Sequence, residues 1–217
     1  MKNKSFFWAS YSDLMTSLFF VMLLLFVTTV TMMYIHEKAT EEELAKIKEL
    51  EGSVQAIDQH YFAYNEEFKK HVLKIEVKYD VYSADISRIP KGTQYDLVEA
   101  GKKIREFVDS VYNKYNSPFL IVVEGQSSKG PYWRNVHENN DVLSYERALA
   151  LVGLWESKGI NLRSDEYSKK CELLICGSGD RGVMRVQPDD KYNEKNQRFL
   201  IHVIPKPGIV NSKNEDK

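Results

Sequence analysis

The chain opens with a long apolar segment. From Leu14 to Tyr34, 21 consecutive residues carry no charge and most are apolar. About 20 such residues suffice for a helix to cross the hydrocarbon core of a bilayer. A cleaved signal peptide would have a shorter apolar core followed by a small-x-small site, and "MMYIHEKAT" is a poor one. We therefore expect a retained transmembrane helix at 14–34.

A polar segment follows, and its pattern is helical. Residues 37–72 are rich in Glu, Lys and Ala, with no Pro and a single Gly. Their apolar positions recur in steps of three and four: Ile47, Leu50, Val54, Ile57, Tyr61, Tyr64 and Phe68. This heptad pattern favours a parallel two-stranded coiled coil, and hence a homodimer. The same stripe also fits a helix that packs on its own globular domain.

After residue 74 the hydrophobic period changes. "KIEVKYDVY", "SPFLIVVEG", "CELLICGSG" and "NQRFLIHVIP" are typical of strands. "TQYDLVEAGKKIREFVDSVYNKY" and "VLSYERALALVGLWESKG" are typical of helices, with Ser144 a candidate N-cap of the second. The order is β-α-β-α-β, and a long loop leads to the final strand. It predicts an α/β sandwich of independent size.

The expected fold class is α+β, with a single N-terminal transmembrane helix and a helical, coiled-coil connector ahead of the sandwich. The expected parts are a cytoplasmic N-terminus and helix start at 1–13, the membrane helix at 14–34, the connector at 35–73, the globular domain at 74–206 and a disordered tail at 207–217.

The charge distribution predicts the orientation of the chain in the membrane. Lys and Arg total 30 against 31 Asp and Glu, so no basic excess points to nucleic acid. Lys2 and Lys4 precede the apolar segment, whereas acidic residues predominate after it. The positive-inside rule then places the N-terminus in the cytoplasm. In a Gram-negative bacterium, this is a single-pass inner-membrane protein with a periplasmic C-terminal domain.

The sequence contains no signature of an enzyme, a metal site or a cofactor. Cys171 and Cys176 fall in one predicted strand, where five residues span roughly 16 Å, whereas a disulfide tolerates about 7 Å. We expect two small buried hydrophobes rather than a disulfide. The five histidines are scattered, and no phosphate-binding glycine motif precedes a helix.

The one charge between residues 6 and 34 is Asp13. An acid near the centre of a membrane helix costs about 2.5–3.5 kcal/mol, so it faces a partner or water. Ser12, Thr16 and Ser17 are candidates to assist an ion there, and they fit equally well as polar spacers. Asp13 also fits an interfacial acid stabilised by the positive end of the helix. A lone carboxylate with few other oxygen ligands favours a proton over sodium.

Two groups of motifs resemble known families. "GQSS", "LSYERA", "GSGD" and "NEKNQRFLIHV" resemble, in order, the G-H-T-D turn, L-S-x-x-R-A helix, G-x-G turn and N-x-x-N-R-R-V-E strand of the OmpA-like peptidoglycan-binding domain. "SYSDLMTSLFFVMLLLFV" resembles the MotB stator subunit, in which one aspartate heads a single membrane helix. The short helix start and small size are more similar to the ZorB subunit of the Zorya anti-phage system.

This resemblance implies a wall-binding site. In OmpA-like domains the turn aspartate and the helix arginine bind the diaminopimelate of peptidoglycan. The arginine corresponds to Arg147, whose guanidinium suits a carboxylate. The aspartate corresponds to Ser128, which cannot pair with an ammonium group, and Gln197 replaces a motif arginine. The other matching positions are Asn193, Asn196 and Arg198.

The resemblance also implies an ion-driven motor. MotB-like subunits form a dimer inside a ring of MotA-like subunits, ions cross at the aspartate, and the outer domain grips the wall. We expect the B subunit of a MotAB- or ZorAB-type motor, with a second copy, a polytopic MotA- or ZorA-like subunit and peptidoglycan as partners. Two alternatives remain open: a static tether between inner membrane and wall without ion conduction, and a sensor that reports wall or phage-induced damage.

Overall fold

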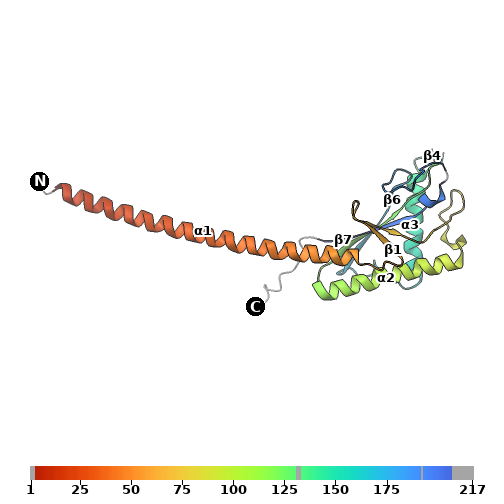
Figure 1. Ribbon diagram of the computed structural model, residues 1–217, viewed down its shortest axis with the longest axis horizontal. Helices are drawn as coiled ribbons and strands as arrows, with labels where there is room; N and C mark the ends of the chain where they lie inside the picture. The colour runs from red at the N-terminus through yellow and green to blue at the C-terminus, as the bar shows by residue number, and fades with distance from the viewer. Residues whose placement is uncertain (1–2, 131–132, 192, 207–217) are drawn as a thin grey trace. The chain divides into compact units, whose positions relative to one another are not determined.

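A computed structural model describes residues 3–130, 133–191 and 193–206 (Figure 1). The chain divides into two compact units, Met1–Lys48 and Glu49–Lys217, and each is described by itself. The tail expected at 207–217 lies outside the described residues.

Helix α1 (Asn3–Gln55) supplies the secondary structure of the first unit. Its apolar side chains between Leu14 and Ile35 are exposed all round the helix, as is typical of a membrane span. Among the described residues, α1 is the one helix long and apolar enough to cross a bilayer. The threonine hydroxyls of this stretch donate to carbonyls three or four residues earlier, so they are satisfied within the helix.

A five-stranded mixed sheet organises the second unit, in the order β1-β2-β7-β3-β6. Its strands are β1 (Phe62–Asn65), β2 (Lys70–Leu73), β3 (Phe119–Gly125), β6 (Cys171–Gly177) and β7 (Phe199–Pro205). Strands β3 and β6 are parallel, and the other neighbours are antiparallel. Four short elements also form: η1 (Ile86–Arg88), β4 (Trp133–Asn135), β5 (Glu138–Asn139) and η2 (Glu194–Asn196). The α+β prediction is confirmed.

The prediction of a helical connector is wrong beyond Gln55. The chain turns at Asp58, whose carboxylate accepts the amide of His60, and then enters the β1–β2 hairpin. The last positions of the predicted heptad seam fall in or beside this hairpin: Tyr61, Tyr64 and Phe68. Earlier positions pack into the core of their own domain: Leu50, Val54 and Ile57. The stripe therefore marks a helix end packed on its domain, and the homodimer stays a prediction.

The strand expected over residues 74–82 does not form. Its alternation nevertheless has a physical cause, because Val77 and Tyr79 point into the core and are 2% and 9% exposed. Alternate burial alone does not make a strand, since ladder pairing is also required. The pairing goes instead to β2, which joins β7 through His71 and Val72.

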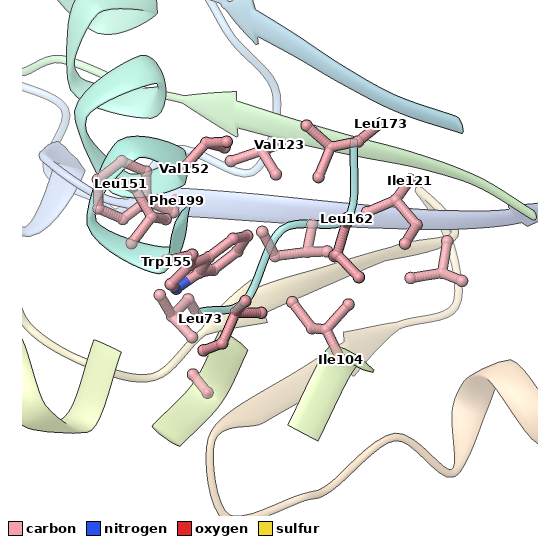
Figure 2. Packing of buried hydrophobic residues seen from close by; sticks show 14 of the residues in the cluster. Leu73, Ile104, Ile121, Val123, Leu151, Val152, Trp155, Leu162, Leu173 and Phe199 are labelled. Atoms are coloured by element: carbon pink, nitrogen blue, oxygen red, sulfur yellow. The ribbon is translucent and has the colours of Figure 1, made fainter. Parts of the chain in front are cut away.

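Helices α2 (Lys91–Tyr115) and α3 (Asn140–Ser157) confirm the two predicted helices. The N-cap of α3 is Asn139, whose side chain accepts the amides of the first turn, so the prediction of Ser144 is wrong. Figure 2 shows the core, in which Trp155 of α3 lies among side chains of the sheet. The indole N–H of Trp155 donates to the carbonyl of Leu97 at 2.8 Å and ties α3 to α2.

The two cysteines both lie on β6 and are free thiols, so the prediction that they do not pair is confirmed. Cys171 is buried, and burial raises its pKa to about 11. Cys176 is only half-buried, which corrects the expectation of two buried hydrophobes.

Gly125 at the end of β3 sets how closely α3 approaches the sheet. A Cβ at this position would lie 2.0 Å from the carbonyl oxygen of Ser144, a backbone atom of α3. We expect Gly125→Ala to lower the free energy of unfolding by about 1–3 kcal/mol, because the helix must move away. Gly153 of α3 is the matched control, since nothing lies within 4 Å of its Cβ position. Gly153→Ala should raise stability by up to about 1 kcal/mol.

Denaturant unfolding of the full chain in detergent, followed by tryptophan fluorescence, measures both glycine variants. Equal midpoints for Gly125→Ala and the unsubstituted chain would contradict the close approach of α3 to β3.

Candidate functional site

Asp13 lies on α1 with a small polar face around it. Thr16 and Ser17 follow it by three and four residues, so they share its side of the helix. The hydroxyl of Thr16 donates to the carbonyl of Ser12 at 2.7 Å, and that of Ser17 to the carbonyl of Leu14 at 2.9 Å. These hydroxyls are therefore satisfied by their own helix. Their role beside an ion stays a prediction.

The start of α1 bears on the interpretation of Asp13 as an interfacial acid. In the described part of the chain α1 runs from Asn3, and the first turn there has no acidic residue. Asp13 lies almost three turns further on, whereas the stabilisation of an anion by a helix N-terminus falls off within the first turn. The helix dipole therefore does not account for this carboxylate.

Arg147 of α3 is buried with one end of its guanidinium unpaired. The residue is 2% exposed. Nε donates to the carbonyl of Ser83 at 3.0 Å, and the guanidinium lies 4.4 Å from the ring centroid of Tyr79. Nη1 is buried and has no hydrogen-bond partner among the described residues. A buried cation with a free donor is suited to receive an anion.

The charge of Arg147 persists at neutral pH. Burial lowers its pKa to about 10, and the neighbouring Tyr79 opposes that shift. Burial also raises the pKa of the Tyr79 hydroxyl, so the ring stays neutral. The guanidinium is therefore a cation throughout the physiological range.

Arg147 lines a cavity of about 40 Å³, and Ser128 lines it too. The structure thus brings together the two positions that the resemblance paired. Lys129 also lines the cavity and pairs with Asp189 at 2.9 Å. None of the lining residues that the structure describes is acidic. The described lining therefore suits a carboxylate and holds no acidic side chain to pair with an ammonium group.

The remaining predicted residues do not join this cavity. Asn196 is fully buried, and its amide exchanges two hydrogen bonds with the backbone of Val186. Asn193 caps η2 and donates to the carbonyl of Pro188. Both shape the loop before β7, and their role as ligand contacts stays a prediction.

Arg198 borders a separate groove of about 480 Å³, formed by residues 72–78 and the loop before β7. Its Nε donates to the side-chain oxygen of Gln126 at 3.1 Å, and Nη2 is buried without a partner in the described part of the chain. Gln197 lines both the groove and the cavity of Arg147. The two arginines that match the motifs therefore lie beside different hollows. Arg147 lines the small cavity, and Arg198 lines the larger groove.

Sequence reasoning missed Tyr79 and Ser83, which contact the guanidinium of Arg147. They lie more than 60 residues upstream of Arg147, in and after a stretch that the pattern assigned to a strand. A local motif cannot reveal such a contact, because it arises from the packing of the chain before α2 against α3.

Glu124 lies at the end of β3 as the centre of a buried charged cluster. Its carboxylate accepts from Lys70 Nζ at 2.8 Å and is 2.9 Å from His202 Nε2. Burial alone would raise the pKa of Glu124, but the hydrogen bonds from His202 and Lys70 outweigh it and hold the pKa at about 2. Because the folded pKa lies below the ordinary 4.5, folding favours the ionised form.

We therefore expect Glu124 to stabilise the fold above about pH 5, and to lose that contribution as the pH falls from about 4.5 towards 2. Glu124→Gln should lower the free energy of unfolding by about 2 kcal/mol at pH 7, and the difference should shrink in acid. Glu172, paired with Lys206 at the surface, is the control. Glu172→Gln should change stability by less than about 1 kcal/mol. Denaturation curves from pH 7 to pH 3 test this, and a pH-independent difference for Glu124→Gln would contradict it.

No family model matches the chain, and no curated protein matches it. Among solved structures, it is similar to the periplasmic domain of MotB, at 14% identity over 69% of each chain with a TM-score of 0.44. It is also similar to the periplasmic domain of Helicobacter pylori MotB, at 14% identity over 66% of this chain and 88% of that one, with a TM-score of 0.43.

A further similar structure is the OmpA-like domain of FopA1 from Francisella tularensis subsp. tularensis SCHU S4. Identity is 19% over 66% of this chain and 79% of that one, with a TM-score of 0.36. Similarity at this level does not by itself establish a shared function. What the residues define is an α+β domain that follows an apolar helix and holds a buried cationic cavity.

Proposed function

We propose that this chain is the ion-conducting subunit of a membrane motor and is anchored to peptidoglycan by its α+β domain. The observation that carries the proposal is Asp13, the one charge in the apolar stretch 6–34. The helix dipole does not account for it, and an ion-carrying role would. Asp13 is the residue that takes up and releases the ion, and the proton is the ion that a lone carboxylate favours.

The carboxyl gives the motor two states. Its neutral form tolerates an apolar partner surface, whereas its ionised form requires water or a polar partner. One elementary charge crossing the membrane releases about 2.3 kcal/mol per 100 mV. An ion gradient can therefore drive α1 between two arrangements. Ser12, Thr16 and Ser17 are proposed to assist the ion on its way to Asp13.

Wall anchoring is assigned to the cavity of Arg147. Arg147 lines the cavity and its buried Nη1 has no partner among the described residues, and peptidoglycan stem peptides end in carboxylates. Ser128 lines the same space and can donate a hydrogen bond to such a group. Sedimentation of the full chain with purified sacculi tests this half of the proposal.

The motor requires partners. One membrane helix cannot enclose an ion path, so a polytopic subunit of the MotA or ZorA type is proposed around a dimer of this chain. The N-terminus is placed in the cytoplasm and the α+β domain in the periplasm, as the flanking charges favour. The surrounding system is proposed to be of the ZorAB defence type, and a flagellar motor is its alternative.

A static tether between membrane and wall is the second candidate. The self-satisfied hydroxyls of Thr16 and Ser17 favour it, because they require no ion or partner. An amide at position 13 separates the two functions. A tether keeps its function with that change, whereas a motor loses it.

A further inference from the structure

The cavity of Arg147 is covered by a short loop. Residues 80–83, called the strap here, run between the buried ring of Tyr79 and η1. The strap ends on the Ser83 carbonyl, which accepts the Nε–H of Arg147 at 3.0 Å. Val81 and Tyr82 of the strap line the cavity. The strap therefore occupies the approach to the guanidinium.

A peptide cannot reach the guanidinium of Arg147 in this arrangement, because Nη1 is buried. The cavity that Arg147 lines has a volume of about 40 Å³, which is enough for a few water molecules. Arg147 is 2% exposed, so no ligand larger than a small ion reaches it in this arrangement. Any stem peptide that binds Arg147 must first displace the strap.

The strap is exposed and carries backbone strain. Within it the amide of Ser83 donates to the carbonyl of Asp80, and the hydroxyl of Ser83 accepts the amide of Asp85. Val81 is 74% exposed and Tyr82 42% exposed, so opening uncovers little apolar surface. Tyr82 has a φ of +58°, a left-handed conformation that non-glycine residues adopt rarely and with strain. The ion pair of Asp80 with Arg88 is long, at 3.4 Å, and exposed. These features are typical of a segment that opens locally.

We propose that the strap is a lid over the Arg147 cavity, which opens so that a ligand carboxylate takes the place of the Ser83 carbonyl on the guanidinium. This inference rests on the proposed wall binding. Ser83 supplies a neutral oxygen, and a carboxylate is the stronger acceptor for a guanidinium. The apparent affinity for the wall is then reduced by the fraction of molecules whose strap is closed.

Thiol labelling of the full chain in detergent measures strap opening without any ligand. Ser127 lines the cavity and is 1% exposed, so Ser127→Cys places a thiol under the strap. The native buried Cys171 reports opening of the domain as a whole. Leu143→Cys, in the same cavity and 4% exposed, is the second position if the first variant does not fold.

Val81→Gly with Ser83→Gly loosens the strap and keeps the carbonyl that Arg147 binds. Two glycines add conformational freedom to the open form, so the thiol at position 127 should react about fivefold faster or more. Glu66→Gly with Glu67→Gly, an exposed pair in the β1–β2 turn, is the matched control and should leave the rate unchanged. Labelling of Cys171 should not change in either variant.

The same strap variant, without the added thiol, should bind purified sacculi more tightly by a similar factor. An unchanged labelling rate at position 127 would overturn the lid. Faster labelling with no sacculus binding by any variant would leave the lid standing and refute the proposed wall binding. Sacculus binding that requires Arg147 but does not respond to the glycines would refute the lid alone.

Discussion

Asparagine in place of Asp13 is expected to abolish ion flow while the protein remains folded and inserted. An amide cannot take up or release a proton, and it closely matches the volume and polarity of the neutral acid. The helix α1 therefore keeps its insertion and its partner contacts, but it is held in one of its two states. Flux should fall to that of liposomes without protein.

The measurement uses the full chain with the proposed polytopic subunit, reconstituted into liposomes that contain a pH-sensitive dye. A potassium diffusion potential drives the flux in sodium-free buffer, so the signal also identifies the proton as the ion. Thr16→Val and Ser17→Ala test the two hydroxyls proposed to assist the ion, both of which bond to carbonyls of their own helix. Each should reduce the flux by less than about tenfold. Equal flux with the amide and the acid would refute the motor and favour the tether.

The accuracy of the sequence predictions follows the length and strength of each pattern. Strand β3 and helix α2 were predicted within two residues of their observed bounds, because an uninterrupted apolar run and a long amphipathic stripe have few rival interpretations. The prediction of a helical connector failed after Gln55. Apolar residues spaced three and four apart also occur by coincidence where a helix end is followed by a hairpin. The turn at Asp58 was the local signal against a continuous helix.

The sequence predicted the candidate site only at the positions that a family motif placed close together in the fold. Arg147 and Ser128 share a cavity, as the motif order implied. Asn193 and Asn196 match the motif equally well, yet their amides hold the loop before β7. A motif match alone does not distinguish residues that line the cavity from residues that hold a loop in place. The strap over Arg147 lies more than 60 residues earlier in the sequence, so no motif around Arg147 could predict it.

Arg147→Met is expected to weaken binding to purified sacculi by about ten- to a hundredfold. A hydrogen bond to a charged group contributes about 1.5–3 kcal/mol, and the methionine offers no donor to a carboxylate. Its length and apolar surface suit the space above the Tyr79 ring. Because a buried cation without a counter-ion gains little from burial, the free energy of unfolding should change by less than about 1 kcal/mol. Loss of binding without loss of stability assigns Arg147 to the ligand rather than to the core.

Arg198→Met is the matched arginine control, since Arg198 matches the motif but borders the other groove. It should keep sacculus binding within about threefold, because its guanidinium contacts Gln126 and does not line the Arg147 cavity. Binding to sacculi should also be constant from pH 6 to pH 8, because Arg147, with a pKa of about 10, stays charged there. If Arg198→Met loses binding and Arg147→Met keeps it, the wall peptide lies in the larger groove, and the cationic cavity serves another anion.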